Sequence, residues 1–255
     1  ETPQGKSIHF IGRDIKFRRE GGLSGDGKLA LVGDYPINLG GDESQLIIKG
    51  SNDKTFVEFD CNGYKQVSVD ASFLFSRNLL LPEDDKGNII PDENVSIDFT
   101  TTLVDWDDIM VEANVPKFQV KGVKDVSFEV KEAVLDFSDT RNPGSVKFPQ
   151  GYSEISPLLA SGTETLWRGV YIREVAIDLP PQFVKENKDE SGNVTDTVTN
   201  RVGFRGYDLV LDNIGFSGRV EAQNLIPLEK GKIGNWNFSL ETIYVNMTAN
   251  ELTDA

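Results

Sequence analysis

Strict alternation of apolar and polar side chains is the feature of this sequence that most limits its fold. In one window apolar residues stand at every second position, at Val67, Val69, Ala71, Phe73 and Phe75. Successive side chains of a strand point to opposite faces of a sheet, so these five are expected on one face and the intervening polar residues on the other. An amphipathic helix needs apolar spacings of three and four, which this window does not sustain.

The same alternation recurs along the chain. It is found at Val126, Phe128 and Val130, at Val175, Ile177 and Leu179, at Phe238 and Leu240, and at Ile243, Val245 and Met247. The 24 glycines and 11 prolines interrupt the chain too often for long helices. We therefore predict an all-β fold of tandem antiparallel units, either β-sandwich-like or an extended sheet, with short helices only near 153–159, where Pro157 interrupts, and 181–187.

Several sequence elements recur in the same order. Phe10 to Gly25 is similar to Phe204 to Gly218, and Gly192 follows Gly87 by 105 residues within matching polar hairpins. The apolar positions Phe128, Val130, Ala133, Leu135 and Phe137 correspond to Phe238, Leu240, Ile243, Val245 and Met247. Both sets contain one step of three residues, which predicts a bulge or bend at 131–132 and at 241–242. Chance similarity among alternating strands is the alternative explanation.

A repeat of this length is the size of a domain. It divides the chain into the C-terminal part of one β repeat at 1–53, a complete repeat at 54–153, and a second, truncated repeat at 154–255. We expect the natural protein to continue with further repeats of the same kind.

Charge and residue counts exclude several classes of function. The formal net charge of −15 and the pI near 4.5 oppose binding to phosphate backbones, so no nucleic acid partner is expected. Cys61 and His9 are the only residues of their types, which excludes an intrachain disulfide and a Cys/His zinc cluster. No apolar run approaches the roughly 18 residues of a transmembrane helix. We assign no catalytic residue and expect a protein that is not an enzyme.

Acidic residues gather on one predicted hairpin, where Asp84, Asp85 and Asp92 are the first metal candidates. A second acidic group, with Asp189, Glu190, Asn193 and Asp196, stands on the matching hairpin. Neither has the spacing of an EF-hand, and Asp, Asn and Gly are also what a solvated turn prefers. We expect no cofactor, with calcium as the open alternative.

No motif is specific enough to name a family, although the acidic β units are similar in general style to large bacterial surface or secreted proteins. We expect a non-enzymatic structural or binding module of a larger, secreted or cell-surface β-repeat protein, with a protein, glycan or lipid as its unidentified partner. A lipid-handling β-groove would use the same strands. A carbohydrate-active protein would use two facing carboxylates or a platform of Trp106, Trp167 and Trp236.

Overall fold

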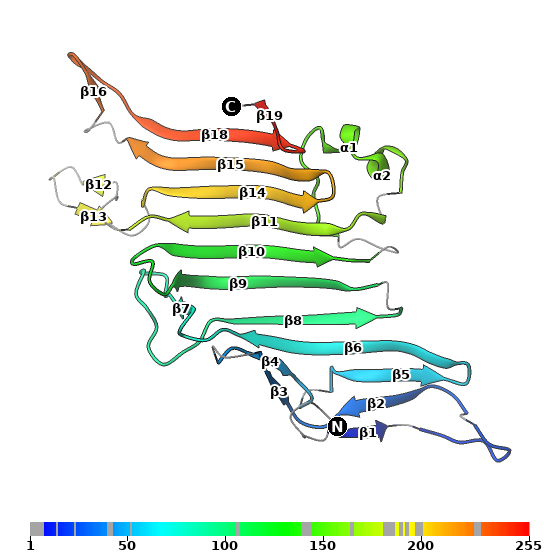
Figure 1. The fold of residues 1–255 in the computed structure, drawn as a ribbon. Coiled ribbons are helices and arrows are strands. Elements are labelled where there is room, and N and C mark those ends of the chain that lie inside the picture. Colours follow the sequence, from blue (N-terminus) through cyan, green and yellow to red (C-terminus); the bar gives the residue numbers. More distant parts are fainter. Residues whose placement is uncertain are drawn as a thin grey trace.

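A computed structural model gives the fold as a long antiparallel sheet system (Figure 1). It describes residues 8–13, 15–22, 24–39, 43–51, 53–105, 108–138, 144–163, 166–180, 187–188, 191, 194–196, 201–226 and 231–254. Strands dominate these residues, which confirms the all-β prediction, and the strand pairs among them are antiparallel. Among the same residues, no helix is long and apolar enough to cross a membrane.

Seven strands form the first sheet and eight the second. The first contains β1 (Phe10–Arg13), β2 (Gly27–Leu31), β3 (Tyr35–Asn38), β4 (Gln45–Ile48), β5 (Phe56–Asp60), β6 (Gly63–Leu74) and β8 (Ser96–Leu103). The second contains β7 (Leu80–Pro82), β9 (Met110–Val120), β10 (Ser127–Asp136), β11 (Gly169–Asp178), β14 (Gly203–Asp212), β15 (Gly215–Ile226), β18 (Leu240–Thr248) and β19 (Glu251–Asp254). Two small hairpins pair β12 (Asn187–Lys188) with β13 (Val194–Asp196) and β16 (Lys232–Ile233) with β17 (Trp236–Asn237).

The long strands follow one another in a single layer, mostly in chain order (Figure 1). The two sheets meet where β8 lies beside β9. There the Thr101 hydroxyl donates a hydrogen bond to the Met110 carbonyl oxygen, with 2.6 Å between the oxygens. The result is a continuous stack of strands in which each long strand pairs with or lies against its neighbours.

Strand β6 has the two faces that the alternation predicts. Val67 pairs with Val57 and Leu103, and Phe73 pairs with Leu46 and Ile97, so these side chains share one apolar face. On the other face, Asp70 accepts a hydrogen bond of 2.8 Å from the Thr100 hydroxyl.

Bulges keep the apolar side chains of the second sheet on one face. Glu132 in β10 has a φ of 48°, and the register with β9 shifts beside it. Asp208 in β14 has a φ of 47°, and the register with β15 shifts there too. The irregularity predicted at 131–132 is therefore confirmed. Near 241–242 a register shift is also present, but its extra residue lies in the opposite strand, β15, between Gln223 and Ile226.

Strand β15 demonstrates what the Asp208 bulge does. In this pair the extra residue lies in β14, and β15 has none between Phe216, opposite Leu211, and Ala222, opposite Phe204. Residues 216 and 222 share a face because they are an even number of positions apart. Leu211 and Phe204 are seven positions apart in the sequence, yet both lie on that face. The bulge thus returns the apolar set to the same side of the sheet.

The tightly packed core lies on the face of the second sheet that is opposite to the face of Phe204 and Leu211. Its buried side chains are Val134, Tyr152, Trp167, Tyr171 and Val210. Tyr152 belongs to α1 (Tyr152–Ile155), which is followed by α2 (Pro157–Ala160). These short helices confirm the prediction for 153–159, and they are separated at Ser156, before Pro157. The second predicted helix, at 181–187, falls outside the described residues apart from Asn187, which begins β12.

Hydrogen bonds to buried tyrosines link this core to β14. The Tyr152 hydroxyl and the Trp167 indole nitrogen both donate to the Asp212 carboxylate, the latter at 2.7 Å, and the Tyr171 hydroxyl donates to Asp208 at 2.6 Å. Burial and the adjacent carboxylates raise the pKa of Tyr152 and Tyr171 well above the usual range.

The raised pKa values of Tyr152 and Tyr171 make the free energy of unfolding depend on pH in a definite direction. Below about pH 10 both tyrosines are protonated in the folded and unfolded states, whereas above it only the unfolded chain releases the protons. We expect the free energy of unfolding, measured by urea denaturation, to fall as pH rises from about 10. Replacing Tyr152→Phe and Tyr171→Phe together should reduce that slope, while Tyr64→Phe at an exposed site should not; equal slopes would contradict the assignment.

Candidate interaction surface

One face of the second sheet is apolar across its long strands, and we call it the open face. Cross-strand pairing defines it from β9 to β18. Its members are Val111, Ala113, Val115, Phe118, Phe128, Val130, Ala133, Leu135, Val170, Ile172, Val175, Ile177, Phe204, Leu209, Leu211, Phe216, Val220, Ala222, Ile243, Val245 and Met247. None of these residues carries a charge.

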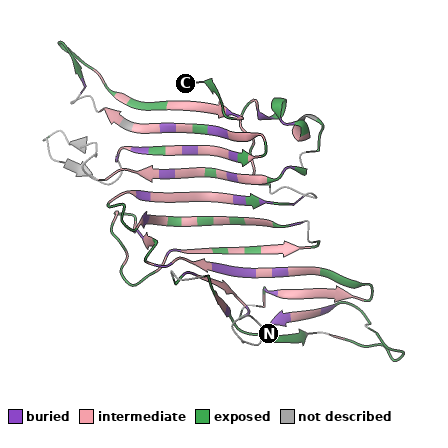
Figure 2. Ribbon diagram, in the orientation of Figure 1, coloured by how far each residue is buried: buried purple, intermediate pink, exposed green. Residues whose placement is uncertain are grey.

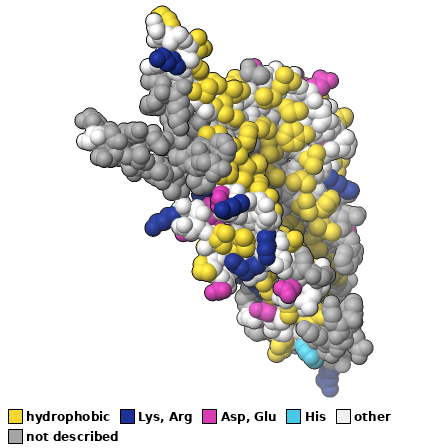
Figure 3. Space-filling model, turned by 60° about the vertical axis from the view of Figure 1, so that its left-hand side comes forward, with side chains coloured by type: hydrophobic (Ala, Val, Ile, Leu, Met, Phe, Trp, Pro, Cys, Tyr) yellow, Lys and Arg dark blue, Asp and Glu magenta, His cyan; other side chains and the backbone are white. Residues whose placement is uncertain are grey.

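No second layer covers this face in the described part of the chain. Each of its side chains is half-buried or exposed, and Leu211, Ile243 and Phe204 are 54%, 50% and 43% exposed. The long strands in Figure 2 are accordingly half-buried or exposed over much of their length. Figure 3 shows hydrophobic side chains gathered in a broad band on one side of the molecule. A soluble monomer seldom exposes so large a continuous apolar patch.

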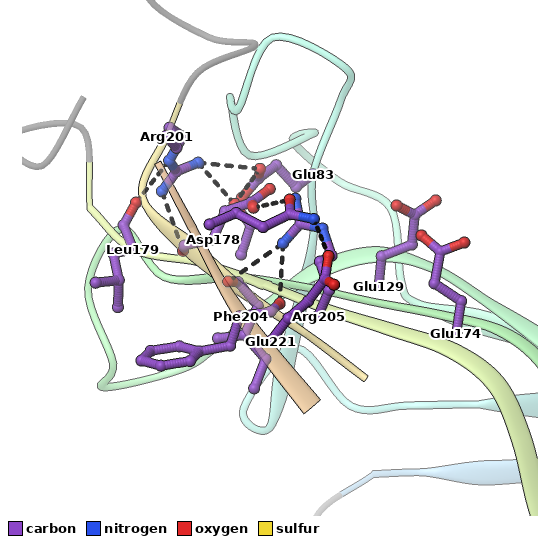
Figure 4. Close-up of polar contacts among 12 residues, drawn as sticks. Glu83, Glu129, Glu174, Asp178, Leu179, Arg201, Phe204, Arg205 and Glu221 are labelled. Atoms are coloured by element: carbon purple, nitrogen blue, oxygen red, sulfur yellow. Dashed lines mark hydrogen bonds and ion pairs between the residues drawn. The ribbon is translucent and has the colours of Figure 1, made fainter. Parts of the chain in front are cut away.

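The opposite face is polar beyond the helices, and its charges pair between strands. Lys131 Nζ lies 3.0 Å from Glu174 Oε1, and Arg205 Nη2 lies 2.5 Å from Asp178 Oδ1. Figure 4 draws part of this surface. Because opposite charges lie side by side, this face is suited to water, and the two faces of one sheet have contrasting chemistry.

One ion pair at the end of this face is almost completely buried (Figure 4). Arg201 Nη1 and Glu83 Oε1 are 3.8 Å apart, with side chains 7% and 2% exposed. Ser127 and Gln119 donate hydrogen bonds to the Glu83 carboxylate, and Arg201 also donates to the Leu179 carbonyl oxygen at 2.6 Å. With these partners the pair joins the segments around β7, β9, β10 and β14, so its role is to brace the sheet.

We expect Arg201→Met to lower the free energy of unfolding by about 3 kcal/mol, because it leaves the Glu83 carboxylate buried without its cation. Adding Glu83→Gln should restore part of the loss. Lys65→Met, which breaks a solvent-exposed pair with Glu58, should lower the free energy of unfolding far less. Chemical denaturation measures all three; similar losses for Arg201→Met and Lys65→Met would mean that burial of the pair is unimportant.

A polar cavity of about 870 Å³ lies on the side of the sheet that carries α1, bounded by β14, β15, β18 and β19. Glu154, Asp208, Glu251 and Asp254 contribute carboxylates to its lining. Its Arg219 is already paired with Glu221, at 2.9 Å. This lining offers acceptors suited to hydroxyl or amino groups, and Met247 is the one open-face residue that also belongs to it.

The metal candidates do not assemble into a cluster in the described residues. Asp84 accepts backbone hydrogen bonds from Lys86 and Asn88, at 2.9 and 2.8 Å, which lower the pKa of its carboxyl. Asp85 and Asp92 are exposed on the same hairpin. Among the described residues no group of three His, Cys, Asp or Glu side chains is placed to hold a metal ion. Asp189, Glu190 and Asn193 fall outside the described residues, as does the side chain of Asp196.

The tryptophans that the sequence suggested as a sugar platform are separated. Trp167 is buried in the core, Trp236 is 81% exposed on β17, and Trp106 lies outside the described residues. Sequence reasoning missed two other features, the exposure of the apolar face and the Arg201–Glu83 pair. The three-residue apolar steps indicated the bulges but not the exposure of the face, and no local pattern marks a pair separated by more than a hundred residues.

Comparison of the chain with protein-family models, curated proteins and solved structures finds no match.

Proposed function

We propose that this chain is a non-enzymatic structural or binding module and that the open face is its contact surface. The observation that carries the proposal is the continuous, uncharged apolar face, which extends over six long strands without a covering layer in the described residues. Its side chains include Phe204, Leu211 and Ile243, each at least 43% exposed. Burying a side chain of this kind contributes roughly 1.5–3 kcal/mol, so a partner that covers several of them gains considerable affinity.

We further propose that the module belongs to a larger β-repeat protein. Strand order supports this, because β6, β8, β9 and β10 are followed in space by β11, β14, β15 and β18, one strand after another. In each set a short hairpin separates the first two strands: the Glu83–Ile89 bridge in the first and β12–β13 in the second. The repeats would be 54–153 and 154–255, preceded by the end of another at 1–53.

A secreted or cell-surface location is part of the same proposal, and its support is the acidic composition. A net charge of −15 keeps such a protein soluble and apart from anionic surfaces. Lipid handling is the second candidate, and it is favoured by the same apolar face, since acyl chains are recognised by apolar surface alone.

The proposal predicts that an apolar probe binds the open face. Nile red, which is neutral and therefore not repelled by the acidic chain, should fluoresce more strongly with the native protein in dilute solution. Ile243→Glu together with Leu211→Glu should abolish most of that increase, because charges then interrupt the face. Circular dichroism checks that the strands persist in the variant.

Thr242→Glu is the matched control for one of these positions. It adds the same charge at the neighbouring exposed residue of β18, whose side chain points to the other face opposite Gln223. Dye binding that all variants reduce equally, or that the native monomer lacks altogether, would show that the open face is no contact surface.

A further inference from the structure

We infer that the partner covering the open face is a second copy of this chain, with the two second sheets packed face to face. This inference rests on the proposed function and names the occupant of the same surface. Two apolar sheet faces pack about 10 Å apart with interdigitating side chains, and identical sheets have the same twist. Such a pair is a two-layer β-sandwich, one of the two arrangements that the sequence suggests.

The size of the open face matches what a stable dimer needs. Its six strands are β9, β10, β11, β14, β15 and β18. At a strand spacing of about 4.8 Å and about nine residues of 3.3 Å each, they cover roughly 850 Å² per copy. A stable, specific interface typically buries about 800 Å² on each partner. The first sheet need not contribute for the contact to reach this size.

The distribution of charge also permits self-association. The chain carries a net charge of −15, which would oppose a contact between acidic surfaces. The paired positions of the open face hold no charged residue, and the carboxylates of Glu174, Asp178 and Glu221 lie on the other face of the sheet. Face-to-face packing therefore keeps these charges on the two outer surfaces of the dimer, separated by both sheets.

The shape of the open face fits the flat surface of another sheet better than it fits a small ligand. Leu209 lies over Gly206 of its own strand, β14, and over Gly218 of β15. A β-carbon at either glycine would meet a Leu209 methyl group at 2.8 Å. The side chain of Leu209 thereby fills the space that the glycines leave at the centre of the face. Small molecules are bound in concave sites that enclose most of their surface, and the polar cavity described above lies on the other side of the sheet.

Sedimentation velocity across a dilution series tests the inference. We expect a reversible dimer whose dissociation constant rises at least ~100-fold in Leu211→Glu, because twofold symmetry places two unpaired carboxylates in the apolar contact. Leu211 belongs to β14, away from the sheet edges, and is 54% exposed, so the variant can fold as a monomer. Phe204→Glu on the same strand provides a second variant should circular dichroism show that Leu211→Glu is unfolded.

Ile243→Glu and Thr242→Glu separate the two faces at adjacent exposed residues of β18. The first should weaken the dimer and the second should not. A dimer that survives Leu211→Glu and Phe204→Glu would be an edge-to-edge assembly and would overturn the inference. A chain that stays monomeric at every concentration would also overturn it.

Nile red distinguishes failure of this inference from failure of the proposed function. For a face-to-face dimer, dye binding per chain should increase on dilution as the faces become free. A persistent monomer that binds the dye would retain the contact surface but assign it to a different occupant, such as an acyl chain or another protein. A monomer that binds no dye would remove both proposals.

Discussion

The bulges at Glu132 and Asp208 are the constraint on which the arrangement of both sheet faces depends. Side chains alternate with a period of two along a strand, so one extra residue transfers every later side chain to the other face. Without the bulge in β14, Leu209 and Leu211 would leave the face of Phe204 and enter the side that holds Tyr171 and Val210. The bulge instead keeps the apolar residues together and frees the other side for the core under α1 and α2.

The fold therefore divides its apolar surface between two purposes. The buried cluster of Val134, Tyr171 and Val210 with Tyr152 and Trp167 is enclosed by the chain itself and supplies stability. The Arg201–Glu83 pair braces the other end of the strands through hydrogen bonds instead of apolar packing. The sheet is thus held at both ends on one side, which leaves the open face unused by the described residues for internal packing.

The sequence allows a good prediction of which side chains share a face and a poor prediction of what covers that face. Alternation at Val67 to Phe73 and the three-residue step between Val130 and Ala133 depend on local backbone geometry, and both correspond to what the structure contains. Coverage depends on segments far away in the chain or on another molecule, and an apolar strand position looks the same whether its cover is internal or external. For the same reason Arg201 could not be paired with Glu83 from the sequence. The turn role of Asp84 could not be separated from metal binding, because the same carboxylate oxygens accept hydrogen bonds in a turn and bind a metal ion as ligands.

The acidity of the chain acquires a physical role once its placement is considered. An apolar face of this size favours indiscriminate association, because the hydrophobic effect has no directionality. A net charge of −15 opposes the approach of two copies in most orientations, since their polar surfaces repel each other over about the Debye length. Face-to-face packing keeps the charged surfaces of the second sheets farther apart than contacts through those surfaces would. Charge repulsion and apolar attraction together thus select one mode of association from many, and added salt weakens that selection because it screens the charges.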